Sequence, residues 1–188
     1  MKGMDDMYKP ILFNTEMVNA ILDGRKTQTR RLVKGRKSDA ALCTPCSAGD
    51  VLWVRETYCP AFYDRCFYKA GSTNEDIETL DQLGYRWKPS IHMPKEAARI
   101  FLRVKNVYVE QLQSIDGMKV LAEGVDNGGS NPAMGNRWEN MQRMAFAHLW
   151  DSTIKRADID KYGWRANPWV WVIEFERCEM PEDFLDAR

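Results

Sequence analysis

Apolar positions along the chain fall into stretches with the length and composition of β-strands. In residues 98–109 apolar and basic residues alternate with a period of two, which predicts a half-buried strand whose basic face carries Arg99, Arg103 and Lys105. Residues 167–176 alternate in the same way and place Trp169 and Trp171 on one side. Further strands are predicted at residues 9–13 and 51–58, with a shorter one at 67–70.

Three segments have apolar positions at helical spacing. The first follows a cap at Asn14 or Thr15 and ends at Gly24, where the chain turns. The second lies between residues 112 and 124 and follows a cap at Ser114 or Asp116, and the third spans residues 137–150. Because these helices do not alternate regularly with the strands, we predict an α+β fold with a mixed, mostly antiparallel β-sheet or small barrel and peripheral helices.

The size of the chain changes this picture little. A length of 188 residues with 44% hydrophobic residues fits one domain with insertions better than two domains. We expect this single domain to span residues 9–177, with insertions near 59–94 and 126–165. Residues 178–188 then form an acidic C-terminal tail.

Charge is spread unevenly along the chain. The formal net charge is zero, so attraction for nucleic acid has to come from a local patch. Such a patch lies between Gly24 and Ser38, which has no carboxylate and contains seven basic residues: Arg25, Lys26, Arg30, Arg31, Lys34, Arg36 and Lys37. A solvated charged loop is the alternative interpretation of the same run.

Apolar runs and cysteines indicate whether the protein enters a membrane and whether it contains disulfides or a metal site. No apolar run approaches the roughly 20 residues of a membrane-spanning helix, and the first residues lack a signal-peptide core, so we expect a soluble, cytoplasmic protein that binds no membrane. Five cysteines in such a chain argue against a disulfide framework. We favour reduced thiols and no metal; the alternative is a structural zinc site at Cys43, Cys46, Cys59 and Cys66.

Two segments carry residue types that line binding clefts. Residues 85–94 combine aromatic, basic and proline residues, which suits either a rigid cleft wall or a proline-braced loop packed over the core. Arg55 and Glu56 end a predicted strand, where the pair either faces a cleft or forms an exposed ion pair at a sheet edge. Glu123 ends a predicted helix, a position where the helix dipole favours a cation instead.

Four motifs occur in a fixed order: GRKTQTRR at residues 24–31, GDVLWVRET at 49–57, AEG at 122–124 and WVWVIEF at 169–175. Together they resemble the ASCH domain family, whose fold is a PUA-like β-barrel. The chain is particularly similar to the longer ASCH proteins of phages and prophages, whose Arg-Trp-x-Pro-Ser-Ile-His-Met-Pro element corresponds to residues 86–94. The resemblance covers about residues 10–176.

The resemblance also implies an activity. Small bacterial members of the family are N4-acetylcytidine amidohydrolases with a Gly-x-Lys-x-x-Thr-x-Arg motif, in which the lysine is the base, the threonine is the nucleophile and a later glutamate is the proton donor. Matched motif to motif, these roles fall on Lys26, Thr29 and Glu123, and Arg31 is the motif arginine. Such a reaction needs a neutral Lys26, and nearby arginines with partial burial would lower its pKa. This chain is nearly twice as long as those enzymes, and its insertions alter the surroundings of the pocket.

A binding module is the alternative from a different functional class. The same cations would then hold phosphate or a nucleobase, tryptophans would stack on bases, and Thr29 would only donate a hydrogen bond. For RNA or a modified nucleoside the expected binding residues are Arg25, Arg30, Arg31, Trp53, Arg55, Glu56, Trp87, Ser90 and His92. We expect no cofactor, and the sequence offers no carboxylate cluster or histidine pair for a nuclease. Natural substrate and oligomeric state stay open.

Overall fold

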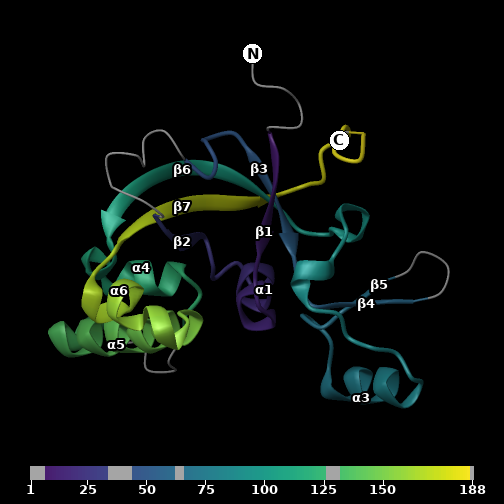
Figure 1. Ribbon diagram of the computed structural model, residues 1–188, viewed down its shortest axis with the longest axis horizontal. Helices are drawn as coiled ribbons and strands as arrows, with labels where there is room; N and C mark the ends of the chain where they lie inside the picture. The colour runs from purple at the N-terminus through teal and green to yellow at the C-terminus, as the bar shows by residue number, and fades with distance from the viewer. Residues whose placement is uncertain (1–6, 34–43, 62–65, 126–131, 187–188) are drawn as a thin grey trace. The chain divides into compact units, whose positions relative to one another are not determined.

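The structure, a computed structural model, describes residues 7–33, 44–61, 66–125 and 132–186. Five strands are hydrogen-bonded in the order β1-β3-β6-β7-β2, and β4 and β5 form a separate hairpin (Figure 1). In chain order the strands are Tyr8–Leu12 (β1), Gln28–Leu32 (β2), Val51–Arg55 (β3), Tyr58–Pro60 (β4), Cys66–Tyr68 (β5), Phe101–Gln111 (β6) and Trp169–Cys178 (β7). The α-helices are Thr15–Leu22 (α1), Asn74–Gln82 (α3), Gly117–Ala122 (α4), Asn136–Thr153 (α5) and Ile159–Tyr162 (α6).

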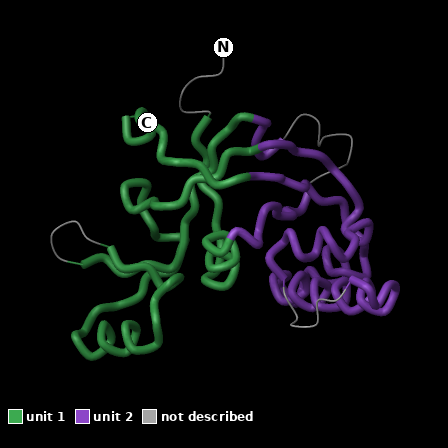
Figure 2. Tube along the Cα trace, turned by 180° about the vertical axis from the view of Figure 1, so that it is seen from behind, with its two compact units in different colours: residues 1–23, 49–104, 176–188 green, residues 24–48, 105–175 purple. Residues whose placement is uncertain are grey.

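The chain divides into two compact units (Figure 2). Unit 1 comprises residues 1–23, 49–104 and 176–188, and unit 2 comprises residues 24–48 and 105–175. Strands β6 and β7 each contribute residues to both units. Each unit is therefore assembled from segments that are far apart in the sequence.

Unit 1 is built around β1, β3 and the start of β6. Strand β3 runs parallel to β1 and antiparallel to β6. One face buries Val51, Trp53, Phe101 and Phe184, so the C-terminal segment completes this core. Asn14 is the N-cap of helix α1, and its side chain accepts a hydrogen bond from the backbone N–H of Met17.

Unit 2 contains β2, most of β7, the second part of β6 and helices α4 to α6. Strand β2 pairs antiparallel with β7, with Gln28 opposite Glu174 and Leu32 opposite Val170. The three helices gather on one side of these strands (Figure 1). They bury one core whose residues are Leu112, Ile115, Val120, Phe146, Trp150, Val170 and Val172.

The α+β class and the mixed sheet are confirmed, since parallel and antiparallel pairs occur together. The predicted strands at residues 9–13, 51–58, 98–109 and 167–176 each correspond to a strand, and 67–70 overlaps β5. Within the described residues the strand order has β1 and β2 at its ends, so the closed barrel stays a prediction.

Several elements were not predicted, among them β2, α3 and the short helix α6. Strand β2 lacks an apolar alternation, because polar and charged side chains occupy Gln28 to Arg31, yet the first three of these residues are buried. Helix α3 lies in the segment interpreted as a polar excursion. Its start was visible in the sequence, since Thr73 and Asp76 form a capping box.

Candidate functional site

Main-chain contacts hold the segment before β2 against the end of α4. Lys26 and Glu123 form an antiparallel bridge, and the Thr27 N–H donates to the Ala122 carbonyl at 2.8 Å. On its other edge, the Thr27 carbonyl accepts from the Phe175 N–H at 2.9 Å. The backbone thus fixes Lys26 next to Glu123 before any side-chain contact is considered.

Close packing of α4 on α5 fixes the position of Glu123 further. Gly117 opens α4, and a Cβ atom there would lie 2.5 Å from Cζ3 of Trp138. Its N–H donates to both carboxylate oxygens of Glu139 on α5, at 2.9 Å each. Only glycine allows this approach, so α4 and the glutamate at its C-terminus are anchored to the longest helix of unit 2.

Three charged side chains meet in the interior of unit 2. Lys26, Arg30 and Glu123 are only 3%, 2% and 4% exposed. The Lys26 ammonium donates to Glu123 Oε2, to the Glu123 carbonyl and to the Gln28 carbonyl, each at 2.8 Å. Arg30 Nη1 donates to the other carboxylate oxygen, Oε1, at 2.9 Å. Both oxygens of Glu123 therefore accept from cations, as expected of an ionised carboxylate.

A second carboxylate continues this network. Glu110 of β6 accepts from Arg30 through Oε1, at 3.1 Å from Nε and 2.6 Å from Nη2. Its Oε2 lies 3.3 Å from the ammonium of Lys119 on α4. The order Lys119, Glu110, Arg30, Glu123, Lys26 is a chain of alternating charge with three cations and two anions.

Thr29 has a different environment from Lys26. It lies beside Arg30 in β2, so its side chain points to the opposite face of the strand from the Arg30 guanidinium. Its hydroxyl accepts a hydrogen bond from Arg31 Nη1 at 3.0 Å, and the residue is 1% exposed. The structure thus joins Lys26 to Glu123 and Thr29 to Arg31.

Burial shifts the pKa values of two of the cations. It lowers the pKa of the Lys26 ammonium from its ordinary value; the charge and hydrogen bond of Glu123 oppose this, and the charges of Arg31 and Arg30 add to it. Burial also lowers the pKa of the Arg31 guanidinium, against the attraction of Glu123. A lowered pKa makes the neutral amine of Lys26 more accessible, as a lysine base requires.

The remaining predicted site residues of unit 2 flank this network. Arg25 Nη1 donates to the Gly124 carbonyl at 3.3 Å. The basic residues Lys34, Arg36 and Lys37 of the same run lie outside the described residues.

Other predicted binding residues belong to unit 1. Trp53 is 9% exposed and packs edge-on against Phe184, with ring centroids 6.2 Å apart. The Arg55 guanidinium carbon lies 5.7 Å from the Trp53 ring centroid, and its Nη2 donates to the Ile91 carbonyl. Glu56 is 1% exposed, and its two oxygens accept from Arg99 at 2.9 and 3.0 Å, so the glutamate forms a buried ion pair.

The segment predicted to form a cleft wall lies near Tyr58. The backbone of Lys88 bridges to Tyr58, and the His92 carbonyl accepts from the Tyr58 hydroxyl at 3.1 Å. The His92 side chain is exposed and Ser90 is half-buried. Two buried donors, Arg55 Nε and Trp87 Nε1, have no hydrogen-bond partner within the part of the chain that the structure describes. These are the groups of unit 1 that a ligand with acceptor atoms would satisfy.

The cysteines do not form a four-residue cluster in the described part of the chain. Cys43 lies outside the described residues, Cys46 belongs to unit 2, and Cys59 and Cys66 belong to unit 1. Among the residues with described positions, no group of three or more histidine, cysteine, aspartate or glutamate side chains could hold a metal ion.

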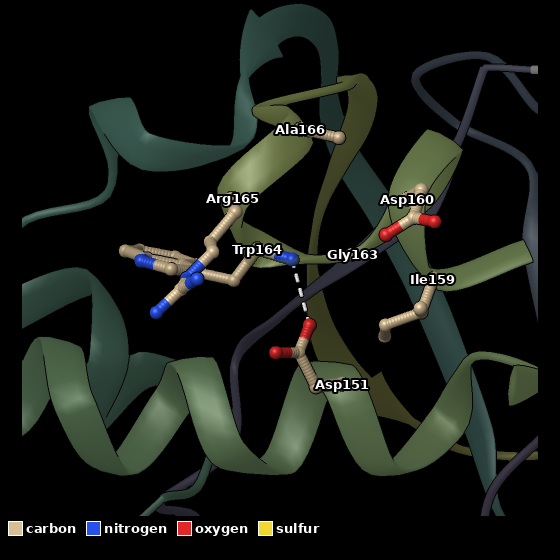
Figure 3. A pocket seen from close by; sticks show the side chains of 7 residues that line it. All are labelled: Asp151, Ile159, Asp160, Gly163, Trp164, Arg165 and Ala166. Carbon is tan, nitrogen blue, oxygen red and sulfur yellow. Dashed lines mark hydrogen bonds between the residues drawn. The ribbon is translucent and has the colours of Figure 1, made fainter.

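A hollow of about 220 Å³ lies elsewhere in unit 2. Figure 3 shows its lining and the hydrogen bond from the Trp164 N–H to Asp151, which measures 2.6 Å. Its residues are Asp151, Ile159, Asp160, Gly163, Trp164, Arg165 and Ala166. None of the catalytic or binding residues predicted from the sequence lines it.

Sequence reasoning missed Glu110 and Lys119 as members of the charged network. Glu110 follows a strand predicted from its basic face, and nothing in the local pattern pairs it with a residue 80 positions away. Gln28 was also missed; its Nε2 donates to the Lys119 carbonyl at 2.7 Å. Finding them would have required knowledge of the tertiary contacts that β2 makes with α4 and β6.

Among solved structures, the chain is similar to an ASCH domain. A high-resolution crystal structure of an ASCH domain from Lactobacillus crispatus JV V101 superposes with a TM-score of 0.42 at 14% sequence identity, over 92% of this chain and 80% of that chain. No protein-family model matches the chain, and no curated protein matches it. No helix in the described part of the chain has the length and apolar character to cross a membrane.

Proposed function

We propose that unit 2 recognises RNA or a modified nucleoside at the charged site formed by Lys26, Arg30 and Glu123. The observation that carries this proposal is the burial of two cations on one carboxylate. Buried charges cost several kcal/mol each to desolvate, and strongly perturbed groups gather at functional sites. Lys119, Glu110, Arg30, Glu123 and Lys26 together retain one excess positive charge, which favours phosphate or an electron-rich carbonyl oxygen as ligand.

Hydrolysis of an N4-acetylcytidine-type amide is the second candidate. The lowered pKa of Lys26 and its 2.8 Å contact with Glu123 favour it. The Thr29 oxygen would attack the acetyl carbonyl and give its proton to Lys26. Glu123, protonated by Lys26 across their hydrogen bond, would give that proton to the departing exocyclic nitrogen. Water would then release acetate from the threonine ester and restore the hydroxyl.

This reaction requires one rearrangement. The Thr29 hydroxyl has to exchange its hydrogen bond with Arg31 for one with the Lys26 amine, because a nucleophile must lie within reach of its base. Arg31, once released, would be placed to stabilise the developing oxyanion, since it lies two residues from Thr29 on the same face of β2.

The test is incubation of the purified protein with N4-acetylcytidine, with cytidine and acetate measured by chromatography. We expect turnover that is abolished by Thr29→Val, which keeps the shape of the buried side chain but removes the nucleophile, and that is retained in part by Thr29→Ser. Circular dichroism and thermal unfolding establish that both variants are folded. Turnover that persists in Thr29→Val would contradict the catalytic assignment.

A protein that turns nothing over can still recognise a nucleoside or RNA. Calorimetric titration with cytidine, N4-acetylcytidine and a single-stranded RNA oligonucleotide measures this directly. We expect binding that is weakened in Arg31→Met, because Arg31 is the half-buried cation next to the site. If the wild-type protein neither binds these ligands nor hydrolyses the amide, the proposed function is wrong.

A further inference from the structure

We infer that Glu110 is a positioning residue of this site, which orients Arg30 and through it the carboxylate of Glu123. This inference rests on the proposed function of the same site. Glu110 matches none of the sequence motifs, and its carboxylate accepts hydrogen bonds from Arg30 and Lys119. It would act on the ligand only through Arg30.

The hydrogen bonds of Arg30 show how the Glu110 carboxylate orients the guanidinium. A guanidinium is a planar, rigid fork, so fixing one edge fixes where the remaining N–H groups point. Nε and Nη2 both donate to Glu110 Oε1, at 3.1 and 2.6 Å. That leaves Nη1 directed at Glu123 Oε1, at 2.9 Å. The Phe146 ring centroid, 5.9 Å from the guanidinium carbon, limits movement out of this plane.

Glu110 also joins the buried part of the network to the surface. Its side chain is 12% exposed, that of Arg30 is 1% exposed, and that of Lys119 is 35% exposed. The contact to Lys119, at 3.3 Å, is longer than the contacts to Arg30. Loss of Lys119 is therefore expected to matter less than loss of Glu110, because an exposed pair contributes little.

The charges around Lys26 predict in which direction its pKa moves when the charge of Glu110 is removed. The charges that act on Lys26 are those of Glu123 from α4 and of Arg31 and Arg30 from β2. Tyr108 of β6 is under the influence of Lys119, Glu110, Glu174 and Arg30. Without the charge of Glu110, the charge of Arg30 acts on Lys26 with less compensation. Lys26 then gives up its proton at lower pH.

The experiment compares Glu110→Gln with Glu174→Gln. The second variant removes the same charge from β7, where the described residues show no ion pair with Arg30. The titration of Lys26 is followed by NMR of its labelled Cε, assigned with Lys26→Met. We expect the midpoint to move to lower pH in Glu110→Gln, to stay in place in Glu174→Gln, and to be largely retained in Glu110→Asp.

Activity supplies the second measurement. If the protein hydrolyses the amide, Glu110→Gln should reduce kcat by about 10- to 100-fold with little change in KM, because misplacement of a catalytic group by about 1 Å costs on that order. The acid limb of the pH profile of kcat/KM should shift to lower pH, as the Lys26 midpoint does.

Two results would overturn the inference. One is a Lys26 titration that is the same in Glu110→Gln and the wild-type protein, and the other is an equal shift in Glu174→Gln, which would indicate a general effect of charge. Absence of turnover, of nucleoside binding and of RNA binding in the wild-type protein would refute the proposed function instead. The Lys26 titration would still decide whether Glu110 positions the network.

Discussion

At the scale of single residues, Glu123 is the member of the site whose loss should be felt most. Its two oxygens each accept from a different buried cation, Lys26 and Arg30. A buried charge that loses its partner costs far more than the pair contributes, since the remaining ion is desolvated without compensation.

We therefore expect Glu123→Gln to lower the free energy of unfolding by about 3–5 kcal/mol, measured by urea titration. The double variant Lys26→Met/Glu123→Gln should recover part of this loss, because it removes one of the two orphaned cations. Lys26→Met alone supplies the remaining corner of the double-mutant cycle. A double variant that is as unstable as the sum of both single changes would show that the two side chains are not coupled.

At the scale of elements, the C-terminal turn packs into the core of unit 1. Phe184 is 0% exposed and packs edge-on against Phe101 and Tyr8, with centroids 4.7 and 5.5 Å away. Lys95 lies over the same ring, 4.6 Å from its centroid. Beside it, Tyr8 donates to Asp183, and burial together with this hydrogen bond raises the pKa of Tyr8 to about 12. The segment predicted as an acidic tail thus provides core contacts.

Phe184→Ala should destabilise the protein by about 3–5 kcal/mol, the usual cost of removing a buried aromatic side chain. Leu185→Ala is the matched control, because the neighbouring side chain is 54% exposed and should change stability by less than about 0.5 kcal/mol. Thermal and urea unfolding measure both. An equal loss of stability in the two variants would show that Phe184 does not hold the C-terminal turn in the core of unit 1.

Elements with apolar periodicity could be predicted from the sequence, and elements defined by charge could not. Helix α5 spans Asn136–Thr153 where residues 137–150 were predicted, and α4 has the predicted cap at Asp116. Strand β2 escaped prediction because its buried residues are polar and its partners in β7 are 138 or more positions away. For the same reason the motif indicated Lys26 and Glu123 but gave no sign of Glu110, which only tertiary pairing brings to Arg30.

At the scale of the whole molecule, zero net charge means that any attraction for nucleic acid has to come from a local patch of cations. Seven cations lie between Gly24 and Ser38, and two of them, Lys26 and Arg30, are engaged with Glu123. At most five cations of this segment are then available to contact phosphates.

If RNA binds through this segment, the logarithm of the binding constant should fall with the logarithm of salt concentration with a slope no steeper than about −3.5, at about 0.7 per phosphate contact. Fluorescence anisotropy of a labelled single-stranded RNA, titrated at several salt concentrations, measures the slope. A steeper slope would mean that cations outside residues 25–37 contact the RNA.

The interleaved composition of the two units has a consequence for synthesis on the ribosome. The last residues of unit 2, up to Phe175, precede the final segment of unit 1, residues 176–188, although unit 1 also contains the earliest residues of the chain. A nascent chain can therefore complete the contacts of Lys26, Arg30 and Glu123 while the core around Trp53 still lacks Phe184. Until residues 176–188 join it, the core of unit 1 lacks the Phe184 ring that packs against Trp53 and Phe101.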